Sequence, residues 1–162
     1  MDYLLNKFFD IKLFDKKKKI CLYNIPEMER LRKSPKTKEG IPKKYLPKSL
    51  SAADRKKQLK SIKEGTKRPQ VKSFKSKGST HKEKFEKKYG YKISNFSRIS
   101  KEIIDKKGID LILSKGKGAY YSGGSRPNQT PQSWALGRLA SVIMGGNARK
   151  VDIDIWNKYK KK

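Results

Sequence analysis

Glycines and basic residues are concentrated between Lys115 and Pro127, where the chain reads KGKGAYYSGGSRP. Glycines allow backbone amide groups to approach a phosphate or a carboxylate closely, and Lys115, Lys117 and Arg126 would add positive charge. A helix expected to begin at Pro131 would turn its amino end, with unpaired N–H groups, towards the same place. The segment is therefore a candidate anion site in a glycine-rich loop.

Other interpretations of this loop stay open. The glycines could serve only to make tight turns between helices, while Tyr120 and Tyr121 pack on the core. A nucleotide pocket is disfavoured, because the segment lacks the GK[ST] ending of a P-loop and does not open directly into a helix as GxGxxG does. The choice lies between an anion contact and a purely structural turn.

Two arginines near the best-defined helix could extend the anion site. Arg138 and Arg149 could point the same way as Arg126, but Arg138 could equally form a structural ion pair with Asp105 or Asp110. The aromatic residues have a similar ambiguity. They would suit base stacking in an exposed basic groove, but apolar neighbours at helical spacing favour core packing, with interface anchoring next; they are Tyr120, Tyr121, Trp134 and Trp156.

The residues needed for catalysis or metal binding are scarce. Ser122, Ser125 and Ser133 have no histidine placed to activate them. The single Cys21 and single His81 cannot build a disulfide, a CxxC clip or a multi-histidine metal site. We therefore expect no catalytic residue, no metal, no cofactor and no small-molecule substrate.

Net charge is the dominant property of the chain. It has 162 residues, with 43 Lys and Arg against 15 Asp and Glu, and a net charge of +28. Hydrophobic residues make up 34%, below the roughly 45–50% of a typical globular domain, so one large core is excluded. No run approaches the roughly 18 apolar residues of a membrane-spanning helix, and the first residues do not read as a signal peptide. We expect an unsecreted protein without a membrane span.

Two segments, 33–48 and 55–78, carry almost no compensating negative charge. Self-repulsion would keep them extended, and disordered unless an acidic protein surface or a nucleic acid binds them. Lysines greatly outnumber arginines, which favours point-charge contact with a polyanion. The candidate binding residues for a polyanion or a protein partner are Lys56, Lys57, Lys67, Arg68, Lys72, Lys75, Lys77, Lys115, Lys117, Arg126, Arg138 and Arg149.

The elements that would position these residues are mainly helical. We expect a β-hairpin, or a short helix followed by a strand, in residues 1–25. A linker rich in proline and lysine should follow in residues 26–50. Residues 51–79 should form a basic helix, from about 52 to 64 between a Ser51 capping box and Gly65, and then an extended arm. Residues 80–162 should form a small helical module that contains the glycine-rich loop.

Within this module the helix boundaries follow capping signals. A Thr80 capping box predicts a helix ending at Gly90, and Ser97 or Ser100 should cap another that ends at Gly108, with a further helix directly after it. Thr130 and Pro131 should begin the best-defined helix, which carries four apolar residues at helical spacing and ends at Gly145 and Gly146. Asp152 should cap a last helix.

Several segments resemble a known family. Residues 44–51 (KYLPKSLS), 54–58 (DRKKQ), 138–142 (RLASV) and above all 115–134 are similar to a lysine-rich domain of unknown function encoded by giant nucleocytoplasmic large DNA viruses. The similarity covers roughly residues 43–155. It implies no activity, but it implies a viral protein packaged in or under the capsid.

The sequence therefore predicts a non-enzymatic structural protein of a virion, either a minor capsid protein or a capsid-lining component. It would be made in the host cytoplasm or the viral factory, and its basic arms would bind capsid proteins or other acidic virion proteins. The alternative is a sequence-independent nucleic-acid-binding protein that condenses the viral DNA.

Overall fold

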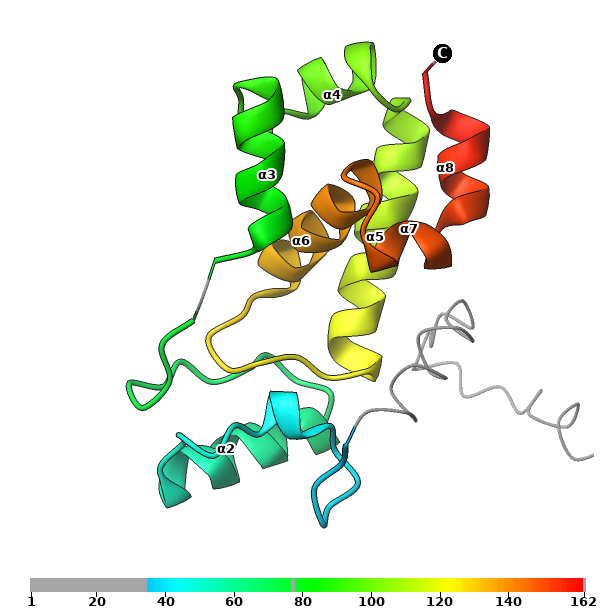
Figure 1. The fold of residues 1–162 in the computed structure, drawn as a ribbon. Helices are drawn as coiled ribbons and strands as arrows, with labels where there is room; N and C mark the ends of the chain where they lie inside the picture. The colour runs from blue at the N-terminus through cyan, green and yellow to red at the C-terminus, as the bar shows by residue number, and fades with distance from the viewer. Residues whose placement is uncertain (1–34, 77, 162) are drawn as a thin grey trace, which may run out of the picture.

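The computed structural model describes residues 35–76 and 78–161 (Figure 1). The hairpin or strand predicted for residues 1–25 and the candidate Lys77 lie outside the described residues. The described chain is mainly helical, as the sequence predicts. Its elements are a 3₁₀ helix, η2 (Lys43–Tyr45), and the α-helices α2 (Ala52–Lys63), α3 (Thr80–Tyr89), α4 (Phe96–Glu102), α5 (Lys106–Ser122), α6 (Pro131–Ile143), α7 (Asn147–Val151) and α8 (Ile153–Tyr159).

Helix α6 begins where its capping signals place it. The amide N–H of Ser133 donates to Thr130 Oγ1 at 3.0 Å, and the Thr130 N–H donates to Ser133 Oγ at 3.1 Å, while Pro131 occupies the first helical position. These two reciprocal hydrogen bonds satisfy two backbone amide groups at the amino end of the helix. The apolar face of α6, including Leu139 and Val142, is fully buried in the main core against α5.

Helix α5 includes most of the segment that was expected to form a glycine-rich loop. The helix continues without a break through Gly108 and Gly116 to Ser122, so only residues 123–130 form a loop. A Cβ on Gly116 would lie 2.7 Å from the Ala135 Cα, which shows that this glycine allows α5 and α6 to pack closely. Gly108 likewise packs under Ile104 rather than ending a helix. The glycine-rich loop expected over residues 115–127 is therefore wrong for residues 115–122, which are helical because Gly116 allows close packing of two helices.

Residues 35–76 form a second layer, which we call the α2 layer; helices α3–α8 with their connections form the helical module. Tyr45 and Leu46 are 2% exposed and lie in a small core with Leu59, Ile62 and Trp134. The described part of the segment predicted as a linker over residues 26–50 is therefore packed and not extended. Prolines there shape a packed turn around η2 because the apolar residues between them find a partner surface.

The two layers meet at the carboxyl end of α5, which Figure 1 shows running from the neighbourhood of α4 to that of α2. The Gln58 side-chain amide donates to the carbonyl oxygens of Tyr45 (3.1 Å) and Ser125 (2.8 Å), so one buried residue of α2 joins η2 to the loop after α5. Lys67, Lys72 and other arm residues are thus attached to a folded layer. The compact region is larger than the predicted module over residues 80–162.

Capping signals located most of the remaining helices. Helix α2 begins after Ser51, whose Oγ accepts from the Asp54 N–H at 3.2 Å, and it ends before Gly65 at φ 63°. Helix α3 ends at Gly90 as expected, but its N-cap is Ser79, because Thr80 is already helical. Helix α4 is capped by Asn95 and not by a serine.

Candidate anion-binding site

Arg68, predicted as a polyanion contact, is instead 4% exposed and serves the fold. Its guanidinium donates to the carbonyl oxygens of Ser61 (2.7 Å) and Tyr120 (2.9 Å), and its backbone N–H donates to Tyr120 Oη at 2.7 Å. Both carbonyls belong to the last turns of helices, α2 and α5, where acceptors lack intrahelical donors. Burial lowers the pKa of this guanidinium from its usual value. Arg68 thus caps two helices at once.

Arg138 is also buried, and its partner is Asp152. The Arg138 Nε and Nη2 atoms lie 2.7 and 2.9 Å from the two carboxylate oxygens of Asp152, which is 1% exposed. Lys115 Nζ lies 3.5 Å from the same carboxylate. The expected pairing of Arg138 with Asp105 or Asp110 is wrong, and the Asp152 side chain makes no helix cap because it faces the arginine.

The Arg149 side chain caps the carboxyl end of helix α6. Its guanidinium donates to the carbonyl oxygens of Val142 (2.7 Å) and Ile143 (2.6 Å) and lies over the Trp156 ring, 4.2 Å from its centroid. A cation at a helix carboxyl end also interacts favourably with the helix dipole. Arg149 and Trp156 therefore form a structural cap. Of the other predicted aromatic residues, Tyr120 is fully buried and Tyr121 is 39% exposed.

The predicted lysines differ from these arginines in exposure. The described members of the predicted set that face solvent are Lys56, Lys57, Lys67, Lys72, Lys75, Lys117 and Arg126. The segment bearing Lys72 and Lys75, expected to be disordered, is held in place by Asn128. The Asn128 amide donates to the carbonyls of Val71 (2.9 Å) and Phe74 (2.7 Å), and its Oδ1 accepts from the Val71 N–H at 2.6 Å.

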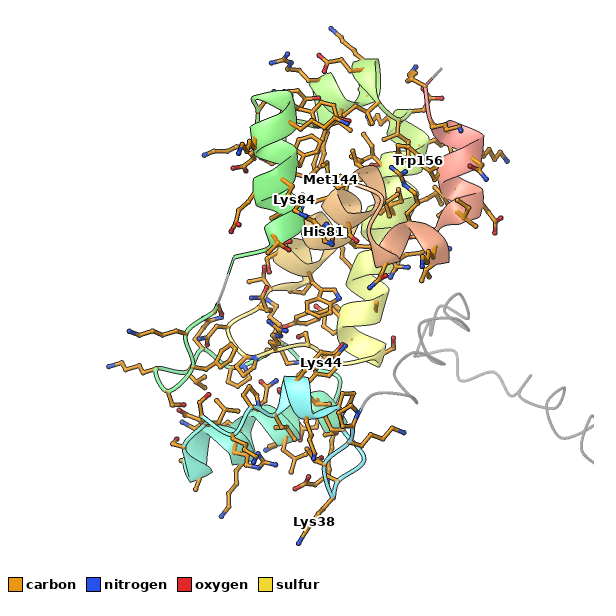
Figure 2. The ribbon with its side chains drawn as sticks, viewed as in Figure 1. Lys38, Lys44, His81, Lys84, Met144 and Trp156 are labelled. Atoms are coloured by element: carbon orange, nitrogen blue, oxygen red, sulfur yellow. The ribbon has the colours of Figure 1, made fainter. Side chains whose placement is uncertain are left out.

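A cleft of about 880 Å³ lies between the α2 layer and the helical module. Its cationic lining residues are Lys44, Lys82, Arg126 and Arg138, its aromatic ones are Tyr45, Phe74 and Trp134, and no described lining residue is Asp or Glu. Figure 2 shows Lys44 on the α2 side and His81 on the side of α3 and α6. The cleft therefore combines positive charge with aromatic surface.

The amino end of α3 opens into this cleft. Ser79, Thr80 and His81 line it, and the Ser79 side chain makes no capping hydrogen bond. A helix amino end carries a partial positive charge that favours an anion. Here the Glu83 carboxylate offsets part of it, because a Cβ on Gly78 would lie 2.6 Å from Glu83 Oε1. Burial lowers the pKa of Lys82 because desolvation disfavours its charged form, while the charge of Glu86 acts in the opposite direction.

Sequence reasoning missed the cleft residues Lys44, His81 and Lys82. They belong to a segment interpreted as a linker and to a helix that gave no binding signal, and only the tertiary fold brings them to Trp134 and Arg126. Of the three basic residues expected in the glycine-rich loop, only Arg126 lines the cleft, and the amino end of α6 that was expected to face the anion is capped by Thr130 and Ser133.

Residues 35–76 and 78–161 contain no group of three or more His, Cys, Asp or Glu side chains that could hold a metal ion. They also contain no helix with the length and apolar character needed to cross a bilayer.

Comparison with known proteins gives a family without an assigned activity. No curated protein and no solved structure matches the chain. A family model described as a family of unknown function (DUF5824) matches residues 42–158, which includes both the α2 layer and the helical module. The matched region thus spans the cleft and nearly all of the described fold, and the chain belongs to the DUF5824 family of unknown function.

Proposed function

We propose that this protein is a non-enzymatic structural component of the particle of a large DNA virus, where it binds nucleic acid through its lysine-rich surface without reading the base sequence. The viral setting rests on the resemblance described above. The protein would be made in the host cytoplasm or the viral factory and packaged with the genome.

The observation that carries the proposal is the imbalance of charge. Even if all 15 acidic residues neutralised a cation each, 43 − 15 = 28 positive charges would need an external counter-ion. In the structure the Asp152 carboxylate is paired with the buried Arg138 side chain, so it is not available to the solvent-facing lysines. Duplex DNA, with one negative charge for about every 1.7 Å of its axis, offers a matching surface.

The division between arginine and lysine favours binding that ignores sequence. Arginine reads guanine edges through its bidentate geometry, but Arg68, Arg138 and Arg149 have structural partners. Exposed lysines such as Lys67 and Lys72 act as point charges on phosphates. Phosphate contacts position a protein on a duplex and carry no sequence information themselves.

Capsid protein is the other acidic partner considered. Residues 41–76, part of which was expected to act as an extended basic arm on such a partner, form a packed layer. A folded basic surface can still bind an acidic protein, so this partner is the competing outcome of the test.

The test is titration of the full chain with a mixed-sequence DNA duplex across a salt series. We expect the logarithm of the binding constant to fall steeply with the logarithm of salt concentration, with a slope of about −0.9 for each phosphate neutralised, and to be similar for unrelated duplexes. Absence of DNA binding at about 100 mM salt, together with co-purification of major capsid protein, would overturn the proposal in favour of the capsid partner.

A further inference from the structure

We infer that the cleft between the α2 layer and the helical module binds an unpaired nucleotide, with its base on Trp134 and its phosphate between Arg126 and the amino end of α3 beside Lys82. This inference rests on the proposed nucleic-acid binding and names the site that a single strand would enter. The same chemistry is carried by a free nucleoside phosphate, and the experiment below separates the two sources.

The size and position of the cleft suit such a ligand. Its volume of about 880 Å³ lies within the range of about 300–1,000 Å³ that is typical of small-molecule sites. It lies between two layers, where ligand sites preferentially occur. A nucleotide is partly flat and aromatic and partly anionic, and the lining divides in the same way into aromatic rings and cations.

The amino end of α3 would bind the phosphate. This helix has ten residues, its N-cap makes no side-chain hydrogen bond, and its first residues line the cleft. His81 Nδ1 is buried and has no hydrogen-bond partner among the described residues, so a polar group at this end lacks a partner. A bound phosphate would interact with the helix dipole and would favour the charged form of Lys82, which burial otherwise disfavours.

Arg126 supplies the second cation from the opposite connection. It lies in the loop between α5 and α6, its side chain is exposed, and no ion pair found among the described residues engages it. An arginine that is already held by a carboxylate, such as Arg138, would have to exchange partners to bind a phosphate. Arg126 can bind one without that exchange.

Trp134 would stack on the base. Its ring is half-buried against Tyr45, with 6.1 Å between the ring centroids and 69° between the ring planes, and it also lines the cleft. The contact with Tyr45 fixes the indole, so little side-chain freedom remains to be lost when a base stacks on it. Stacking on an aromatic ring tolerates every base, which agrees with binding that ignores sequence.

A paired base is a poorer ligand for this site. Bases inside a duplex are stacked on each other, and moving one into a protein pocket costs unstacking and unpairing energy. Exposed lysines elsewhere can bind the phosphates of either form. The cleft should therefore add a preference for single strands to a general affinity for nucleic acid.

The test uses tryptophan fluorescence in the full chain carrying Trp156→Phe, which retains a ring under Arg149 and leaves Trp134 as the only one of the two tryptophans. The probes are oligothymidylate, a duplex of the same length, and thymidine monophosphate. We expect oligothymidylate to quench Trp134 and the duplex to quench it several-fold less at equal saturation. Thymidine monophosphate identifies the source, because quenching at micromolar concentration indicates a free nucleotide and quenching by the oligonucleotide alone indicates a strand.

Three variants locate the site. Arg126→Gln should weaken oligothymidylate binding more than Lys117→Gln, which removes the same charge from an exposed residue of α5 that does not line the cleft. Trp134→Leu should lower the affinity for oligothymidylate at least about five-fold, with little change for the duplex. Arg126→Gln changes an exposed side chain, so it stays informative even if Trp134→Leu unfolds the small core.

The outcomes separate this inference from the proposed function. Salt-dependent duplex binding with no quenching, or equal effects of Arg126→Gln and Lys117→Gln, would overturn the cleft as a nucleotide site and leave the proposed function standing. Quenching by thymidine monophosphate without binding of either polymer would overturn the proposed function and support the cleft. Failure of all three probes would overturn both.

Discussion

At the scale of single residues, arginine and lysine have different tasks in this protein. A guanidinium offers several N–H donors in a fixed plane and can satisfy carbonyl oxygens from two segments at once. Arg68 donates to carbonyl oxygens of α2 and α5, and Arg149 donates to two carbonyl oxygens at the carboxyl end of α6. Lysine carries a single, strongly hydrated charge, which suits the solvent-facing positions such as Lys67 and Lys75.

Replacing Arg68 by Met tests this division. The change leaves the buried Tyr120 carbonyl without the guanidinium donor and removes one of two donors to the Ser61 carbonyl, which keeps the Thr66 N–H, so we expect the free energy of unfolding to fall by about 2–4 kcal/mol. The matched control is Lys67→Met, which removes the neighbouring exposed charge and should change stability by less than about 0.5 kcal/mol. Urea unfolding followed by circular dichroism measures both, and equal effects would show that Arg68 has no special role.

The buried pair of Arg138 and Asp152 gives a second prediction. Arg138→Met would leave the Asp152 carboxylate buried beside Lys115 alone among the partners described above, and we expect a loss of about 3 kcal/mol. The double variant Arg138→Met with Asp152→Asn should lose less than the sum of the single variants, because it removes the uncompensated charge. Additive losses in thermal or urea unfolding would contradict a coupled pair.

At the scale of elements, two glycines in facing helices differ in whether they have room for a side chain. A Cβ on Gly116 would meet the Ala135 backbone at 2.7 Å, whereas a Cβ on Gly137 would meet only Ser79 Oγ at 4.0 Å. We expect Gly116→Ala to destabilise the fold by about 1–3 kcal/mol by separating α5 from α6. Gly137→Ala should stabilise α6 by about 0.5–1 kcal/mol, because it restricts the unfolded chain without a clash. The midpoints of thermal unfolding should therefore move in opposite directions, and a shared direction would refute the packing argument.

The sequence predicts the elements that have local signals at both ends. Ser51 and Gly65 bound α2, and Thr130 with Pro131 begins α6, because capping is a contact between near neighbours in the chain. It does not predict the continuous helix α5, because a glycine pattern alone cannot distinguish a loop from a helix that packs closely against another helix. Here Gly116 packs against Ala135 of α6.

The candidate site was less predictable than the helices for the same physical reason. Of the cationic and aromatic residues that line it, Arg126, Arg138 and Trp134 were singled out by residue type, and all three come from the expected loop or the helix after it. Lys82 and the uncapped end of α3 gain significance only from what lies across the cleft. Conversely, Arg68 looked like a free cation because its acceptors come from α2 and from a helix more than fifty positions later in the sequence.

At the scale of the whole molecule, excess positive charge acts against the fold. Over residues 35–76 and 78–161, exposed ion pairs join Lys60 to Glu64, Arg98 to Glu102 and Lys161 to Asp105, and pairs of this kind contribute little to stability. A net charge of +28 repels itself more strongly in the folded chain, where the charges are closer together, than in an expanded one. A bound polyanion would remove this repulsion and stabilise the folded state by mass action.

Ionic strength should therefore raise the stability of the isolated protein. Salt at about 0.1 M shortens the range of electrostatic interactions to about 10 Å, which screens repulsion over most of the surface and leaves the buried Arg138–Asp152 pair largely unaffected. We expect Tm to rise by about 3 °C or more between low salt and about 0.3 M sodium chloride, since 1 kcal/mol corresponds to roughly 2–4 °C for a chain of this size. Scanning calorimetry in chloride salts of two different cations controls for specific ion effects. A Tm that falls with salt would show that attractive pairs outweigh repulsion, and a bound polyanion would then not stabilise the fold by removing repulsion.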